Sequence, residues 1–250
     1  MSDLFNSHVY KVADSYVRVL TGEGYDPTFT TITDEQGKHI ADSFIKSSNT
    51  EQYTRESLLA YAQFKAELRL QYDYALLIGG LTPEVWTHDG QPYANSRAVY
   101  DDVLNNNHLY FFRTSDGFGS DDSVDYSNHP LLEKTGIILN GFELCFNDLF
   151  RIVHDYFGHS IYGFQFGAKG ETNAWQSHLA MFLTRESKLA LSNEAQNQTC
   201  YFNFGSHLRR ADGSLPKKGD ADYIPLNERP YADQIVLILN PNVYEGLAQF

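Results

Sequence analysis

Histidine and carboxylate side chains gather in one short stretch of this 250-residue chain. His154 and His159 stand five residues apart near the end of an apolar segment, and Glu171 and His178 follow shortly after them. Two imidazoles and one carboxylate with open positions are the ligand set of non-haem Fe(II) oxygenases. The same ligands can hold Zn²⁺ or Mn²⁺ and activate water. The residue types and their spacing therefore predict a mononuclear metal site.

The first two ligands need a particular helix end. An apolar pattern predicts a helix over residues 141–157, so His154 would lie inside it and His159 just beyond it. On an ideal α-helix, side chains five residues apart do not share a face. We therefore expect Gly158 to end the helix and to let His159 turn back toward His154.

A second predicted helix, over residues 172–191, must supply the carboxylate. Glu171 and His178 are seven residues apart, which places them on one face, two turns from each other, and Trp175 lies near the same stripe. If this helix packs back against the first, Glu171 reaches both histidines. Glu194, which follows the helix, is a rival for the third ligand position.

Other side chains near the ligands are expected to support the site. Asp155 or His178 would orient a ligand imidazole by a hydrogen bond, and His178 is alternatively a fourth ligand. Arg113 is a candidate to bind a substrate carboxylate with two parallel hydrogen bonds. Trp175 is a candidate to contact a cofactor or substrate, although a core position is the more common one for such a residue.

Residues 154–159 (His-Asp-Tyr-Phe-Gly-His) resemble the iron-binding segment of the aromatic amino acid hydroxylases, whose motif is His, an acid, two apolar residues, Gly and His. The resemblance implies that both histidines bind Fe(II), that a later glutamate matched in spacing by Glu194 completes the triad, and that the reaction is O₂-dependent hydroxylation (monooxygenation) of a small organic substrate. The family's Pro-Glu-Pro-Asp stretch is replaced here by residues 147–151 (Asn-Asp-Leu-Phe-Arg). The use of a pterin or of another cosubstrate therefore stays open.

The His-Asp pair at residues 154–155 also resembles the HD-domain phosphohydrolases, which add an earlier histidine and a later aspartate. His129 could be the earlier histidine. The candidates for the later aspartate are Asp212, Asp220 and Asp222. This alternative implies that Asp155 is a metal ligand and that the reaction is hydrolysis of a nucleotide phosphate. A zinc peptidase of the His-Glu-x-x-His type needs histidines four apart, and the spacing here excludes it.

The charge balance limits the partners. With 32 acidic and 19 basic residues, the net charge of −13 argues against general nucleic-acid binding and against an anionic membrane surface. A non-enzymatic alternative is an acidic binding or inhibitor protein with a basic partner. Two cysteines, no long apolar run and no apolar leader at the N-terminus favour a cytoplasmic protein that does not enter a membrane. The predicted metal site favours a small molecule as the substrate.

The length favours a single domain over residues 1–250, and the patterns predict a mostly α (α+β) fold with a few short strands. Residues 205–222, rich in Gly, Pro, Lys and Asp, are expected to be a mobile loop, and the acidic residues 114–122 a solvated loop or lid. The further expected helices are 3–20, 34–45 and 54–78. The expected strands are 28–33, 108–112, 201–204 and 234–239.

Overall fold

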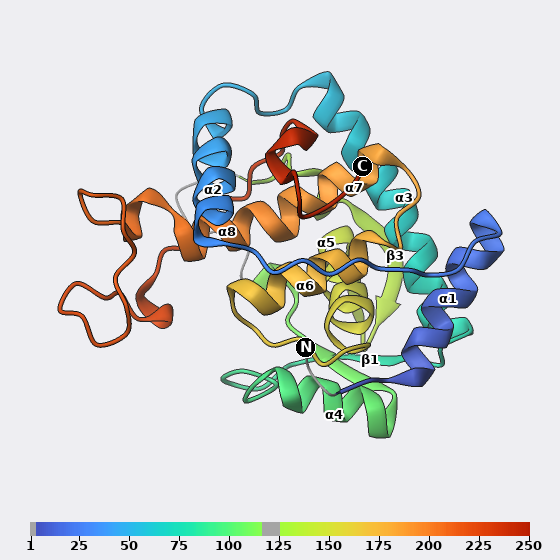
Figure 1. Cartoon of the computed structure of the whole chain (residues 1–250). Coiled ribbons are helices and arrows are strands. Elements are labelled where there is room, and N and C mark those ends of the chain that lie inside the picture. Colours follow the sequence, from blue (N-terminus) through green and yellow to red (C-terminus); the bar gives the residue numbers. More distant parts are fainter. Residues whose placement is uncertain (1–3, 117–125) are drawn as a thin grey trace.

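The computed structural model describes residues 4–116 and 126–250 and is mostly helical, as the sequence predicts (Figure 1). Most of the acidic loop 114–122 lies outside the described residues. The α-helices are α1 (Ser7–Thr21), α2 (Asp34–Ser48), α3 (Arg55–Leu77), α4 (Ser96–Asn106), α5 (Phe146–Val153), α6 (Ala168–Leu179), α7 (Arg185–Ser192) and α8 (Gln198–Phe204). Two π-helical turns are η3 (His154–His159) and η4 (Asn193–Asn197). The strands are β1 (Thr82–Val85), β2 (His108–Phe111), β3 (Lys134–Leu139) and β4 (Phe142–Cys145).

The first three helices begin and end where local capping groups stand. Thr33 and Gln36 form a capping box that starts α2. Thr54 accepts a hydrogen bond from a first-turn N–H of α3. Gly22 ends α1 with a φ of 80°, a conformation that glycine adopts without strain. These signals are local, which is why the sequence predicts all three helices within a few residues.

The strands form two small ladders. β1 and β2 pair in parallel and α4 connects them, so the predicted strand at 108–112 is confirmed. β3 and β4 form an antiparallel hairpin, and its turn residues Asn140 and Gly141 have φ values of 49° and 83°. Two successive positive φ values are typical of the tight turns that match strand twist. The predicted helix start at residue 141 is therefore wrong, because this turn commits the next residues to β4.

Three predicted strands are not strands: residues 28–33 are irregular, and the surroundings of residues 201–204 and 234–239 override the other two predictions. The aromatic run 201–204 is the last turn of α8, because α7, η4 and α8 continue one another without a break. Residues 234–239 are extended and mostly buried but form no ladder within the described chain. Their carbonyls bond instead to the Asn193 amide and to the Tyr53 backbone N–H. The predicted helix 172–191 is two helices, α6 and α7, with a turn between them.

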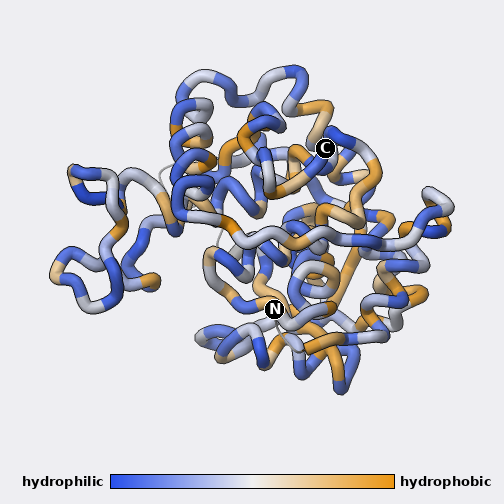
Figure 2. The backbone as a smooth tube through the Cα atoms, in the orientation of Figure 1, coloured by the Kyte–Doolittle hydropathy of each residue, from blue (hydrophilic) through white to orange (hydrophobic). Residues whose placement is uncertain are grey.

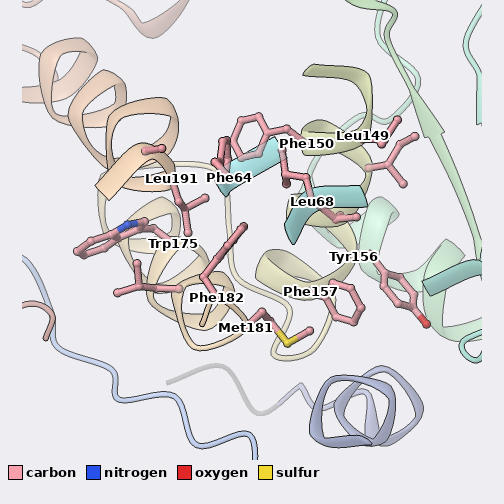
Figure 3. Close-up of a cluster of buried hydrophobic side chains, with 14 of the residues drawn as sticks. Phe64, Leu68, Leu149, Phe150, Tyr156, Phe157, Trp175, Met181, Phe182 and Leu191 are labelled. Atoms are coloured by element: carbon pink, nitrogen blue, oxygen red, sulfur yellow. The ribbon is translucent and has the colours of Figure 1, made fainter. Parts of the chain in front are cut away.

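A cluster of buried hydrophobic side chains lies where α3 packs against α5 and α7 (Figure 3). Phe64 of α3, Phe150 of α5 and Phe182, which follows α6, are buried there with their rings in contact. Hydrophilic residues cover the outer segments, including the chain after α8 that projects beside α2 (Figures 1 and 2). Across residues 4–116 and 126–250, no helix has both the length and the hydrophobicity that a bilayer crossing needs.

Candidate metal centre

Two histidines and one glutamate converge at the end of the helix that α5 begins. The Nε2 atoms of His154 and His159 lie 4.0 and 3.3 Å from Oε2 of Glu171, and one ligand atom of each residue lies within 4.8 Å of the others. Metal–ligand bonds of about 2.1 Å separate adjacent ligand atoms by roughly 3 Å. A small contraction of this group would therefore hold one metal ion. Both imidazoles are buried, and the Glu171 side chain is 26% exposed.

A π-helical turn, rather than a helix end, brings the histidines onto one face. Residues 154–159 form η3, in which backbone bonds join residues five apart, such as Ser160 N–H to the Asp155 carbonyl at 3.0 Å. A π turn closes one residue later than an α turn, so side chains five apart lie together. The expectation that Gly158 ends the helix is therefore wrong.

Gly158 serves instead to permit close packing. A Cβ atom on this residue would lie 3.0 Å from the Ala174 carbonyl of α6 and 3.3 Å from Nδ1 of His154. The hydroxyl of Ser177, also on α6, donates to the carbonyl of Phe157 inside the π turn at 2.7 Å. These contacts seat α6 against η3, with Glu171 in the first turn of α6 facing the two histidines.

The ion pair between His159 and Glu171 shifts both pKa values. Burial alone would lower the pKa of His159, but the facing Glu171 carboxylate raises it to about 9. Burial alone would raise the pKa of Glu171, but the two imidazoles lower it to about 2. Nδ1 of His159 lies 3.0 Å from the Phe164 carbonyl, which can only accept. The Nε2 atom therefore remains for a metal once the imidazole is neutral.

His178 contacts a ligand imidazole, which is one of the two roles expected of it, whereas Asp155 does not take the orienting role. Nδ1 of His178 lies 3.2 Å from Nδ1 of His154, and its Nε2 lies 2.7 Å from Oε1 of Gln71. Both ring nitrogens are occupied, so His178 is not a fourth ligand. Among the described residues, the hydrogen bonds that orient the ligand imidazoles come from His178 and the Phe164 carbonyl, and none comes from the Asp155 carboxylate. Burial raises the pKa of Asp155.

A cavity of about 780 Å³ opens beside the triad and is lined by His154 and Glu171. Arg113 and Arg151 also line it, and the Arg113 guanidinium lies 4.1 Å from the centre of the Phe142 ring. The cavity can therefore hold a small molecule next to a metal bound by the triad. Its aromatic lining consists of Phe112, Phe150, Phe166, Phe202 and Tyr231.

Glu194 lines the same cavity but does not join the triad. It lies in the second π turn, η4, where it accepts hydrogen bonds from Tyr61 and, at 3.4 Å, from Gln198. Burial raises its pKa to about 7, although these hydrogen bonds act in the opposite direction. The structure thus assembles the triad with Glu171, and Glu194 is a separate ionisable group on the cavity wall.

The remaining candidates lie elsewhere. Trp175 is fully buried, donates to Ser192 and packs on Tyr244, so it belongs to the core and not to the cavity lining. His129 accepts a backbone N–H at Nδ1, which leaves its proton on Nε2 and no lone pair for a metal. The three downstream aspartates have other partners than a metal site. Asp220 and Asp222 form ion pairs with Arg210, and Asp212 accepts a hydrogen bond from the Ser214 N–H.

Sequence reasoning missed the polar side chains of α3 that face the site. Gln71 and Tyr61 are both fully buried on the face of α3 that packs against the core, and they bond to His178 and Glu194. A glutamine or glutamate among the apolar positions of a helix can be recognised in the sequence. It predicts a buried hydrogen bond, because a buried polar side chain needs a partner. The Phe164 carbonyl carries no such signal, since every residue has a carbonyl.

Comparison of the chain with protein-family models, with curated proteins and with solved structures gives no match. The resemblance to the aromatic amino acid hydroxylases rests on residues 154–159 and the spacing of Glu194, and the HD-type resemblance rests on the His-Asp pair and His129. The function of the chain is therefore inferred from the geometry of the triad and of its cavity.

Proposed function

We propose that the protein is a mononuclear non-haem Fe(II) oxygenase that hydroxylates a small organic substrate. The observation that carries the proposal is the 2-His-1-carboxylate group formed by His154, His159 and Glu171 at the wall of a cavity. Three protein ligands leave coordination positions of the metal open. Fe(II) held in this way would supply the activation of O₂. The same residues could hold Zn²⁺ or Mn²⁺, so the identity of the metal is part of the proposal.

The residues of the site would have three separate roles: metal binding, packing against the substrate and recognition of its charge. The triad would hold the metal, with the Phe164 carbonyl orienting His159. The aromatic rings of the cavity would pack against the substrate and exclude water, which strengthens electrostatic interactions inside the site. Arg113 and Arg151 place positive charge along the cavity, which suits a substrate with an acidic group.

The phosphohydrolase alternative has less support from the structure. It needs His129 as a ligand, whereas a backbone N–H occupies Nδ1 of this residue. It also needs a downstream aspartate near the His-Asp pair, whereas Asp220 and Asp222 pair with Arg210 in the segment that projects beside α2. A non-enzymatic binding role would leave the buried triad and its cavity without a use.

Metal analysis tests the proposal directly. Protein purified without chelator and reconstituted anaerobically with Fe(II) is expected to bind one ion per chain. His154→Ala and Glu171→Ala are expected to lose it, whereas His39→Ala, which removes an exposed histidine of α2, should keep it. Equal metal content in all four proteins would refute the site.

A second assay separates the reactions. Oxygen uptake by the iron-loaded protein would be followed with a panel of small aromatic and aliphatic acids. A panel of nucleotides would be tested with Mn²⁺, Fe²⁺ and Mg²⁺ under anaerobic conditions. Uptake of O₂ coupled to a hydroxylated product is the expected result. Nucleotide hydrolysis without O₂ would overturn the oxygenase proposal in favour of the phosphohydrolase.

A further inference from the structure

We propose that Gln71 and His178 are positioning residues that hold His154 in the one tautomer able to bind a metal through Nε2. This inference rests on the proposed metal centre. A continuous line of contacts joins the three side chains: Gln71 Oε1 lies 2.7 Å from His178 Nε2, and His178 Nδ1 lies 3.2 Å from His154 Nδ1. The line begins at the backbone of Met181, whose carbonyl lies 3.4 Å from the amide nitrogen of Gln71.

The Met181 carbonyl sets the direction of this chain. A carbonyl can only accept, so the amide nitrogen of Gln71 must face it and Oε1 must face His178. Because Oε1 also only accepts, the proton of the neutral His178 ring stands on Nε2 and its Nδ1 is bare. The His154 ring must then carry its proton on Nδ1, and its Nε2 is bare and directed toward Glu171.

The opposite direction would disable the site. If Gln71 donated to His178, the proton of His178 would stand on Nδ1 and would be donated to Nδ1 of His154. His154 would then keep its own proton on Nε2, where no lone pair would remain for a metal. A single amide orientation on α3 therefore decides whether the ligand on η3 is competent.

Burial keeps water from replacing the chain. Gln71 and His178 are both fully buried. The His178 ring lies between aromatic rings, with centroids 5.0 Å from Phe182 and 6.4 Å from Phe150, and it is nearly parallel to the latter. An imidazole that loses a hydrogen-bond partner in such surroundings finds no other, so its tautomer and its ring orientation both become free to change.

The partner of His154 is itself informative. Ligand histidines commonly donate to a carboxylate or a backbone carbonyl. Here the acceptor is a neutral imidazole, and burial holds the pKa of His178 well below its usual range. The hydrogen-bond partner of His154 therefore carries no negative charge, and among the described residues Glu171 is the one carboxylate of the triad that would neutralise a bound ion directly.

Nitrogen-15 NMR of the histidine rings tests the direction of the chain. The spectra would be taken on metal-free and on zinc-loaded wild-type protein near pH 8 and read at the rings of His154 and His178. The expected result is a proton on Nε2 of His178 and on Nδ1 of His154 in both forms. A proton on Nδ1 of His178, or on Nε2 of metal-free His154, would overturn the proposal. This measurement does not depend on whether the iron-loaded protein is active.

Variants test the consequence for metal binding. Gln71→Met and His178→Phe keep size but remove the hydrogen bonds, and each is expected to weaken zinc binding about 10- to 100-fold. His178→Gln can still accept from His154 and donate to Gln71, so it should retain affinity within a few-fold of wild type. Gln176→Met, a buried glutamine of α6 that bonds to Thr30 and Leu247 away from the site, is the matched control.

Each outcome has a definite meaning. Wild-type affinity in Gln71→Met and His178→Phe, or an equal loss in Gln176→Met, would overturn the positioning role. If a variant fails to fold, the ring spectra of the wild-type protein still decide the direction of the chain. If the wild-type protein binds no metal at all, the proposed function fails, whereas the spectra continue to report on the tautomers.

Discussion

Metal binding at the triad should release a proton, and this prediction follows from the ion pair between His159 and Glu171. With the pKa of His159 raised to about 9 by the facing carboxylate, the metal-free site at neutral pH holds an imidazolium. A metal ion needs the neutral ring, so it must displace that proton. The same ion pair lowers the pKa of Glu171 to about 2, and because the two shifts describe one interaction they count once.

The size of the effect can be worked out. For a group with a pKa of about 9, the proton-free fraction rises roughly 90-fold between pH 6 and pH 8, and the apparent metal affinity should rise with it. An ordinary histidine with a pKa near 6.5 would give a rise of only about fourfold over the same range. The sign is fixed, because binding must become tighter as the pH increases.

Competition with a chromophoric chelator for cobalt(II), carried out at several pH values, measures this slope. Calorimetry in buffers of different ionisation enthalpy would count the released protons, and about one per metal is expected. Glu171→Gln is the matched variant for the pKa itself, because its amide cannot hold an imidazolium. The pKa of His159 should then fall well below about 9 in a nitrogen-15 titration of the metal-free protein. A fourfold rise of the metal affinity in wild type, or an unshifted pKa of His159 in Glu171→Gln, would refute the reasoning.

The ion pair should also act on the stability of the metal-free protein. A raised histidine pKa contributes stability that is fully present below its unfolded value near 6.5 and is lost as the pH rises through about 9. The full shift corresponds to about 3 kcal/mol. Urea unfolding of the metal-free protein should therefore show a decline between these pH values that Glu171→Gln lacks. A flat profile in the wild-type protein would contradict the shift.

Three further substitutions probe the frame of the site. Gly158→Ala forces a Cβ against the α6 backbone and a ligand ring, so we expect weaker metal binding in a competition assay and a loss of about 1–3 kcal/mol in unfolding free energy. Glu67→Ala removes the acceptor that caps α7 and should cost about 3 kcal/mol in urea unfolding, whereas the exposed Gln63→Ala on α3 should change it by less than about 0.5 kcal/mol. Tyr61→Phe removes a donor to the Glu194 carboxylate, so the pKa of Glu194 should rise above about 7 in a carbon-13 titration; an unchanged or lower value would contradict the assigned contact.

The candidate ligands could be found from the sequence because ligand chemistry restricts residue type. Histidine and glutamate at close spacing on two neighbouring helices limit the choices to a few side chains. The choice between Glu171 and Glu194 was open, since helix geometry favoured one and the family resemblance favoured the other. Tertiary packing decides it: Tyr61 of α3 holds Glu194 on the cavity wall, away from the triad.

Other parts of the fold depend on partners distant in sequence and could not be predicted from local patterns. The aromatic run 201–204 has the composition of a strand, but it continues the helix that begins in α7. Residues 234–239 have the composition of a buried strand and are indeed mostly buried, yet Asn193 and Tyr53 take the place of a neighbouring strand. In both segments the hydrophobic side chains are enough to predict burial. The backbone conformation depends instead on the neighbouring segments of the chain, which local patterns do not reveal.

The five-residue spacing of the two candidate histidine ligands indicates the kind of helix on which they lie. On an α-helix, ligands four apart share a face, and ligands five apart do so where the backbone widens into a π turn. That widening interrupts the regular hydrogen bonding of the helix, and the chain compensates at the same place: Ser160 donates to the Asp155 carbonyl, and Ser177 of α6 donates to the Phe157 carbonyl. The contacts that stabilise the π turn thus include the helix that carries Glu171. Formation of the turn and arrival of the third candidate ligand are therefore one packing event, and a π turn of this kind inside a helix is frequent at functional sites.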